Sequence, residues 1–402
     1  MQRKVRSGVA LGLILTLVGC GGGGSGGGSG ATEQLVLKPG VSIADDNAPF
    51  QVVSTAPNTV TVSGDASGLV PGTLLVSGEG AGFLRLVDSV VPQGANTLIN
   101  TSQGTLDDAF QEASFKRQVT IGPEQIAEFV PAAPGITMDP PNAPGRGRGD
   151  TLEISLTLVD FELDSNGPAK LSVSGSISIG LGFDFDVKWG AGQKYVKAAF
   201  QFSASAEASL KAALAKSIAH KKIPLGVLIG NPIPILVFGF PIVVVPTINL
   251  YAEFDGTVKV GANLTSQASV KAELGVVYNN GNFDLVADLD PSASLVPKPN
   301  FYSSLSFRFT PVKVDAFIAI YGIAGPYASC DLPRLELSFT QQANPAGLHV
   351  GAGAVFEGST GLKMNIFGRN LLDKEYPLAI SQRINFLDRF FPNNGGVDVE
   401  VK

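Results

Sequence analysis

The sequence has few of the residues that most often carry chemistry. Its 402 residues include two His, two Cys and one Trp, and only 16% are charged, whereas soluble domains carry about 25%. So few His and Cys exclude a multi-His metal site, a Cys-rich zinc site and a disulfide framework. The net charge of −6 argues against the basic footprint of a nucleic-acid-binding protein. We therefore expect no nucleic-acid partner and no cofactor.

The two histidines lie in surroundings that favour a surface position. His220 is followed by Lys221 and Lys222, and neighbouring cations suggest a solvated turn. His349 falls among small residues on the polar face of an alternating segment. We assign no catalytic residue, and whether the chain is an enzyme stays open, with a non-catalytic role favoured.

The first nineteen residues have the three parts of an export signal. Basic residues occupy positions 3, 4 and 6, and an apolar run of about ten residues follows, too short to span a bilayer as a helix. The run ends in Leu17-Val18-Gly19-Cys20. This tetrad resembles the lipobox of bacterial lipoproteins. The resemblance implies a signal peptide over 1–19 and lipid attachment at Cys20: a diacylglyceride on its sulfur and an acyl chain such as palmitate on its new amine.

Residues 21–30 contain only Gly and Ser, a composition typical of flexible coils. We interpret 20–45 as a lipidated Cys followed by a tether. Asp at position +2 of a mature lipoprotein resembles an inner-membrane retention signal, and Gly21 stands there instead, so the resemblance favours the outer membrane or cell surface. With Cys20 acylated, Cys330 has no partner, and we expect it to be a buried small apolar residue rather than a nucleophile.

Residues 46–125 read as a small β module. The segment 58–64 alternates between polar and apolar residues, and Pro71-Gly72 marks a turn. Thr105 is a good N-cap for a short helix, because acidic residues follow it in the first turn. Residues 126–150 form a Pro/Gly linker. The linker contains Arg148-Gly149-Asp150, a tripeptide that integrin-binding proteins display, and we derive no function from it.

From residue 151 onward, apolar and polar residues alternate over unusually long stretches. Between 171 and 189 the odd positions are almost all apolar. In two later segments, 196–212 and 258–276, the even positions are almost all apolar instead. This pattern predicts antiparallel strands with one buried face. We predict an all-β fold class: a small N-terminal β module followed by a large antiparallel β-sandwich with long alternating strands over 151–402.

Two segments of this region are harder to interpret. The segment 209–222 places apolar residues four apart, as a helix would, but it also continues a strand alternation, and we favour a strand. The segment 233–248 is the most apolar of the chain. Its three prolines (234, 241 and 246) argue against a transmembrane helix, and we expect a buried pair of strands broken around Phe238–Pro241.

Two patches of the body resemble known exported proteins. Gly82–Val87, together with Gly104–Phe110, resembles a β module found in many exported bacterial proteins. The Pro-rich block 223–251 and Tyr321–Tyr327 resemble large secreted β-rich bacterial proteins of unassigned activity. The resemblance implies an exported β architecture and supplies no catalytic residues.

Two acidic segments are weak candidates for calcium binding. Asp160, Glu162 and Asp164 place oxygen ligands at every second position, as one loop of a Ca²⁺ site can. Gly does not fall at the sixth position and the closing Glu is missing, so we interpret the segment as a polar hairpin turn. A second acidic loop, Asp284–Asp290, is similar. We predict no metal site.

We predict an outer-membrane-anchored surface lipoprotein with a structural, adhesive or ligand-binding role. Its partners would be the membrane, through the N-terminal lipid, and a cell-surface polysaccharide or a protein ligand. One alternative is a membrane-inserted β-barrel pore or transporter, because transmembrane strands need only about 9–11 residues. Another is a hydrolase acting on polysaccharide or lipid, in which two carboxylates would meet in space.

Overall fold

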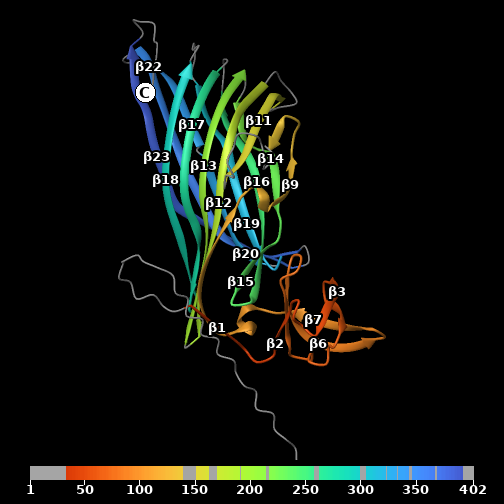
Figure 1. Cartoon of the computed structure of the whole chain (residues 1–402). Helices are drawn as coiled ribbons and strands as arrows, with labels where there is room; N and C mark the ends of the chain where they lie inside the picture. The colour runs from red at the N-terminus through yellow and green to blue at the C-terminus, as the bar shows by residue number, and fades with distance from the viewer. Residues whose placement is uncertain are drawn as a thin grey trace, which may run out of the picture. The chain divides into compact units, whose positions relative to one another are not determined.

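The structure is a computed structural model in which the part of the chain from Glu33 onward forms one compact unit (Figure 1). The residues it describes are 33–138, 151–162, 170–190, 192–213, 217–257, 262–298, 305–322, 324–332, 334–343, 346–366 and 369–392. These residues are almost entirely in antiparallel β-sheets that pack together. The predicted all-β, sandwich-like fold class is confirmed. The predicted signal peptide, Cys20, Arg148–Asp150 and Asp164 lie outside the described residues.

A six-stranded sheet is built from residues 41–103. Its strands follow the order β2-β5-β6-β7-β4-β3. They are β2 (Val41–Ala44), β3 (Phe50–Ala56), β4 (Thr59–Gly64), β5 (Leu74–Ser77), β6 (Phe83–Gln93) and β7 (Asn96–Gln103). Val60, Val62 and Ile99 lie in a small core of its own. The predicted short helix follows as α1 (Leu106–Ala109), with the Thr105 hydroxyl accepting from the backbone N–H of Asp108.

The second sheet, called here the β12 sheet, has eight strands in the order β1-β8-β12-β13-β17-β18, with β11 on β12 and β10 on β11. They are β1 (Gln34–Leu37), β8 (Phe110–Ile121), β10 (Ile136–Met138), β11 (Thr151–Glu162), β12 (Lys170–Gly190), β13 (Gln193–Ala213), β17 (Ala262–Asn279) and β18 (Asn282–Lys298). Along one edge of β12, β11 pairs with the first half of the strand and β8 with the second.

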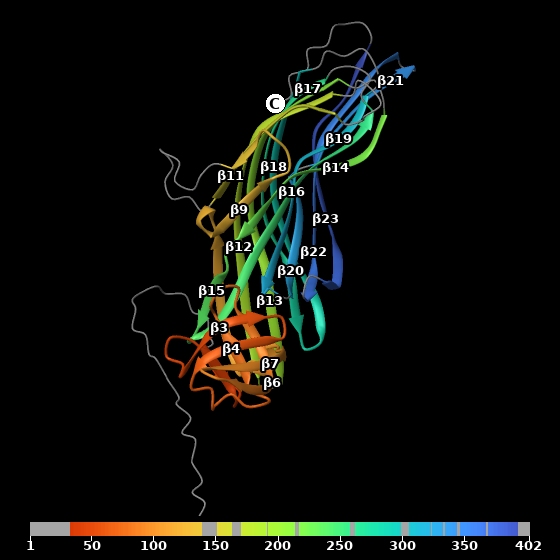
Figure 2. The same cartoon turned by 90° about the vertical axis from the view of Figure 1, so that its right-hand side faces the viewer.

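The third sheet, called here the β16 sheet, has nine strands in the order β20-β22-β21-β19-β16-β14-β9, with β15 on β16 and β23 on β22. They are β9 (Ile126–Pro131), β14 (Ser217–Gly230), β15 (Ile233–Val237), β16 (Phe240–Thr257), β19 (Leu305–Ile320), β20 (Ala324–Leu332), β21 (Arg334–Ala343), β22 (Ala346–Ile366) and β23 (Arg369–Pro392). A short 3₁₀ turn, Pro123–Gln125, precedes β9. Figure 2 shows the long strands of the β16 sheet beside those of the β12 sheet.

The main hydrophobic core lies between the β12 and β16 sheets. Phe183 and Phe200 enter it from the β12 sheet, and Ile248 and Val314 enter it from the β16 sheet, each no more than 1% exposed. The period-two pattern explains this packing, because alternate side chains of a strand point to opposite faces. The odd positions of β12 from 177 to 187 are all buried, as the alternation predicted.

The segments that the sequence left ambiguous are strands. Residues 209–213 end β13 and residues 217–222 begin β14, and no described residue of this stretch is helical. Residues 233–248 form the predicted strand pair, β15 and β16, with its break at Phe238-Gly239. The strands are long rather than broken at their glycines: β12 and β13 each have 21 residues, so each spans roughly 70 Å.

Candidate functional site

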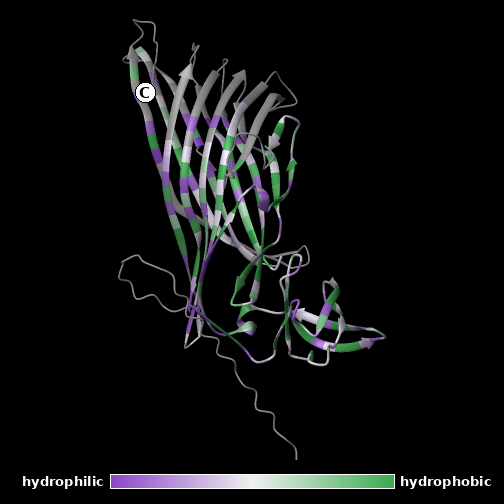
Figure 3. Cartoon of the chain, viewed as in Figure 1, coloured by the Kyte–Doolittle hydropathy of each residue, from purple (hydrophilic) through white to green (hydrophobic). Residues whose placement is uncertain are grey.

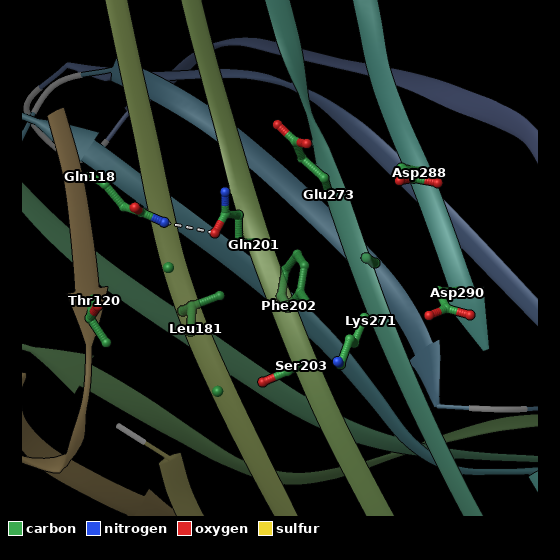
Figure 4. A pocket seen from close by; sticks show the side chains of 13 residues that line it. Gln118, Thr120, Leu181, Gln201, Phe202, Ser203, Lys271, Glu273, Asp288 and Asp290 are labelled. Carbon is green, nitrogen blue, oxygen red and sulfur yellow. Dashed lines mark hydrogen bonds between the residues drawn. The ribbon is translucent and has the colours of Figure 1, made fainter. Parts of the chain in front are cut away.

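A polar hollow lies on the β12 sheet, among the side chains that point away from the core (Figure 4). Its volume is about 500 Å³, and it crosses β8, β12, β13, β17 and β18. It is lined by Gln118, Thr120, Gly180, Leu181, Gly182, Gln201, Phe202, Ser203, Lys271, Ala272, Glu273, Asp288 and Asp290. Because neighbouring strands lie about 4.8 Å apart, the five strands extend over about 19 Å.

Two glycines of β12 make the floor of the hollow. Gly182 is paired with Gln201 on one side and with Thr120 on the other. A Cβ atom at Gly182 would lie 3.5 Å from Cβ of Gln201 and 3.6 Å from the carbonyl oxygen of Val119, which is ordinary contact. The backbone there has room for a side chain that the sequence does not supply. Together with Gly180, this leaves a gap between the polar rows of β8 and β13.

A chain of side-chain hydrogen bonds crosses β12 beside this floor. Nε2 of Gln118 donates to Oε1 of Gln201 at 2.8 Å, and Nε2 of Gln201 donates to Oδ2 of Asp184 at 2.9 Å. Asp184 is only 4% exposed, although it lies on the outward face of its strand. Its second oxygen, Oδ1, has no hydrogen-bond partner among the described residues. The two amides therefore fix one side of the hollow and hold a buried carboxylate.

An ion pair fixes the next strand. Nζ of Lys197 on β13 lies 2.5 Å from Oε1 of Glu273 on β17. Partial burial acts to lower the pKa of Lys197, but the hydrogen bond to Glu273 and the nearby carboxylates outweigh it and raise that pKa. Lys197 therefore remains protonated and orients Glu273 at the wall of the hollow.

Carboxylates gather at the far side of the hollow. Glu273 is directly opposite Asp288 in the β17–β18 register, and Lys271 is opposite Asp290. Asp288 and Asp290 are exposed. A general acid of a glycoside hydrolase is usually held in an apolar setting that raises its pKa. These acids are instead open to solvent or, in the case of Glu273, paired with a lysine, which suits binding better than proton transfer.

The hollow therefore offers amides and hydroxyls on both sides of a glycine floor, and a lysine and carboxylates at its far side. Gln118, Gln201 and Ser203 can each donate and accept hydrogen bonds. The exposed acids can accept hydrogen bonds from a ligand. Such a surface matches a ligand with many hydroxyl groups.

A second polar cluster lies on the β16 sheet. Both terminal nitrogens of Arg334 lie 2.8 Å from the carboxylate oxygens of Glu357. Nζ of Lys313 lies 3.4 Å from Oδ1 of Asp331 and 3.5 Å from Oε1 of Glu253. Burial raises the pKa of Asp331 to about 6, while the charge of Lys313 acts to lower it. Each charged group of this cluster already has a partner of opposite charge, so we consider the hollow the stronger candidate for a ligand site.

The residues singled out in the sequence do not meet in this hollow, except for Asp288 and Asp290. Asp284, Asp288 and Asp290 all lie on strand β18, not in a loop as expected. The turn before this strand is only Asn280-Gly281. Asp160 and Glu162 belong to the end of β11. Within the described residues, no group of three or more His, Cys, Asp or Glu side chains is placed to hold a metal ion.

The remaining candidates lie apart from the hollow. Cys330 is 1% exposed, and burial raises the pKa of its thiol to about 12, so it is a buried residue, as expected. His220 is exposed. Nε2 of His349 lies 3.0 Å from Oδ1 of Asp388, and both side chains are partly exposed.

Sequence reasoning missed Gln118, Asp184 and Gln201. The alternation placed Asp184 and Gln201 on polar faces, but only strand pairing shows that these two residues and Gln118 are neighbours. Gly180 and Gly182 were the available signal, because they separate the serines from the aspartates on the outward face of β12.

No helix in the described part of the chain has the length and apolar character that a bilayer crossing needs. No protein family, no curated protein and no solved structure matches the chain.

Proposed function

We propose that the chain is an outer-membrane-anchored surface lipoprotein whose β-sandwich body binds a cell-surface polysaccharide. Support for the anchor comes from the sequence Leu17-Val18-Gly19-Cys20 and the Gly/Ser run behind it. The described body begins just beyond that run. Glu33 is the first described residue, and its carboxylate lies 2.8 Å from the Arg117 guanidinium. A lipid on Cys20 would therefore be joined to the body through a short segment of chain.

The observation that carries the binding role is the hollow on the β12 sheet. Its side chains come from neighbouring strands of one sheet, so the sheet itself fixes their spacing. The Gln118–Gln201–Asp184 chain and the Lys197–Glu273 pair hold part of it in place before a ligand arrives. A preorganised site loses less conformational entropy on binding. A glycan suits it because hydroxyl groups can bond with amides and carboxylates at once.

The anchor is tested by mass spectrometry of the N-terminal peptide and by membrane fractionation. We expect the mature chain to begin at an acylated Cys20 and to stay in the membrane through a carbonate wash. A Cys20→Ala chain with an ordinary cleavable secretory leader should be released as a folded β protein. An unmodified Cys20, or a variant that stays in the membrane through the wash, would contradict the proposed anchor.

The ligand site is tested by calorimetric titration with polysaccharide prepared from the cell surface. Gly182→Thr adds a side chain on the floor of the hollow, where a Cβ atom fits without a clash. We expect this variant to bind at least about tenfold more weakly, which corresponds to 1.4 kcal/mol. Ser176→Thr places the same residue at an exposed site on the same face of the same strand, by adding one methyl group to the serine, and should bind like the wild type. Equal affinity of all three proteins would rule out the hollow as the binding site.

A further inference from the structure

The hairpin formed by β15 and β16 has an exposed apolar tip. Leu236 is 64% exposed and Phe238 is 55% exposed. The side chains between and beyond them, Val237 and Phe240, are fully buried. The whole stretch 223–252 contains no Asp, Glu, Lys, Arg or His, and Figure 3 shows the hairpin coloured as hydrophobic.

The turn at this tip holds an aromatic residue where the backbone favours Asn or Gly. Phe238 has φ of +50° and Gly239 has φ of +85°, both in the left-handed region, which Asn and Gly tolerate best. The β17–β18 hairpin places Asn280 at the equivalent position, with φ of +49°. Tyr321 is also left-handed, but it is buried and its hydroxyl donates to the carbonyl of Pro241. Phe238 is exposed, so folding alone does not account for an aromatic residue there.

The rest of the outward face of this hairpin is already covered by the protein. A Cβ atom at Gly78 would lie 2.8 Å from Cβ of Pro241, and one at Gly82 would lie 2.5 Å from a methyl group of Val243. The six-stranded sheet therefore packs on Pro241 and Val243, while Leu236 and Phe238 lie beyond this cover. The two exposed residues are the part of the apolar face that the body leaves for another partner.

The base of the hairpin adjoins the place where the described chain begins. The ring of Phe240 lies 5.1 Å from the ring of Phe110, and Phe110 pairs with Leu37 at the end of β1. Thirteen peptide steps separate Cys20 from Glu33, and a chain of that length spans at most about 45 Å. A lipid on Cys20 would therefore hold this end of the body within about that distance of the bilayer.

We propose that the Leu236–Phe238 tip inserts into the interfacial layer of the membrane that carries the lipid anchor. This inference rests on the proposed lipoprotein function. Aromatic and aliphatic side chains at the tip of a segment without charged residues partition into the headgroup and acyl boundary. A stable protein partner needs about 800 Å² on each side, which two side chains on a narrow turn do not supply. A bilayer accepts a small apolar tip without a complementary surface.

The test places a tryptophan at the tip of the full-length, acylated protein. Phe238→Trp is made in a Trp189→Phe background, which removes the only native tryptophan. The protein is reconstituted into vesicles of phosphatidylethanolamine and phosphatidylglycerol with lipids brominated on their tails. We expect the emission to shift to the blue and to be quenched by the brominated lipid. The matched control is Val130→Trp in the same background, at a 43% exposed position on β9, which we expect to remain unquenched.

A Phe238→Asn variant checks that loss of the aromatic ring does not damage the fold, because Asn suits the left-handed backbone of this turn. Its thermal midpoint should not fall, while hydrogen exchange at the hairpin tip, slowed by vesicles in the wild type, should be fast. Acylation of Cys20 without quenching at position 238 would overturn this inference and leave the proposed anchor intact. An unmodified Cys20 would overturn the anchor itself. Protection of the Phe238→Trp indole from soluble quenchers with no lipid quenching would indicate a second copy or another protein and would also overturn the inference.

Discussion

Gln201 donates from Nε2 to Oδ2 of Asp184 at 2.9 Å, and this bond connects one side of the hollow to a buried carboxylate. The other carboxylate oxygen of Asp184, Oδ1, has no hydrogen-bond partner among the described residues. The amide is thus the donor that compensates for the burial of Asp184. Removing it would leave a buried carboxylate with no hydrogen bond, which is among the costlier changes in a protein interior.

We therefore expect Gln201→Leu to lower the free energy of unfolding by about 2–3 kcal/mol. Urea denaturation followed by circular dichroism measures this change. Ser203→Ala is the control, because Ser203 is exposed on the same face of β13, two residues along, and should change stability by less than about 0.5 kcal/mol. An equal and small effect of both substitutions would mean that the Gln201 amide does not compensate for the burial of Asp184.

Two glycines of the β12 sheet should respond very differently to alanine. A Cβ atom at Gly275 would lie 2.4 Å from the carbonyl oxygen of Ala198 and 2.6 Å from Cβ of Ala199, so Gly275→Ala forces the β13 and β17 backbones apart. We expect a loss of about 2–3 kcal/mol, as for an overpacked core. Gly182→Ala meets only ordinary contacts and should be neutral or slightly stabilising. Thermal unfolding of the two variants side by side tests the contrast.

The fold class followed from the sequence because the alternation is long and regular. In β12 the pattern predicted that Phe183 and Phe185 would be buried, and both are at most 1% exposed. It also predicted a strand over 209–222, where helical spacing competed with strand alternation, because a strand continues the phase of the residues before it. Thr105 similarly predicted the start of α1 from a local capping rule.

The hollow did not follow from the sequence, for a physical reason. Periodicity states which face a residue occupies, but it does not state which residue of another strand stands beside it. Asp184 was predicted to face water, and it is buried because Gln118 and Gln201 lie over it from strands that the sequence could not bring into register. Side chains from five strands make the site, so no short motif marks it.

Cys330 should not react with thiol reagents while the protein is folded. Its side chain is 1% exposed, and burial raises the thiol pKa to about 12, so the reactive thiolate is scarce and out of reach. Alkylation by iodoacetamide at pH 8 should be negligible in native protein and complete in urea, as measured by the mass of the intact chain. Rapid labelling of native protein at this position would show that the β20 region opens.

The turn at Phe238 offers a stability test that is separate from any membrane. In detergent-free buffer, Phe238→Asn should leave the free energy of unfolding unchanged or raise it by up to about 1 kcal/mol, because Asn tolerates a positive φ. Phe238→Val should lower it, because a β-branched residue is strained at this backbone angle. Denaturation curves of the two variants give the difference directly. A more stable Val variant would show that the turn changes its backbone conformation.

The buried Asp331 should stabilise the protein more in mild acid than at neutral pH. Burial raises its pKa in the folded state to about 6 from 3.8, so the folded state binds the proton more tightly than the unfolded chain does. The contribution of Asp331 to stability is therefore greatest below about pH 4, falls as the pH rises to about 6, and is constant above that. The full change is up to about 3 kcal/mol, at 1.36 kcal/mol for each pKa unit.

Urea unfolding of wild type and Asp331→Asn at a series of pH values measures this contribution. The charges of Lys313, Glu253 and Glu357 act on this carboxyl group. The difference in stability between the two proteins should change between about pH 4 and 6, the interval between the unfolded and folded pKa values. Asp288→Asn, at an exposed site, should follow the wild type throughout. A wild-type curve parallel to that of Asp331→Asn over this range would mean that Lys313 keeps Asp331 ionised.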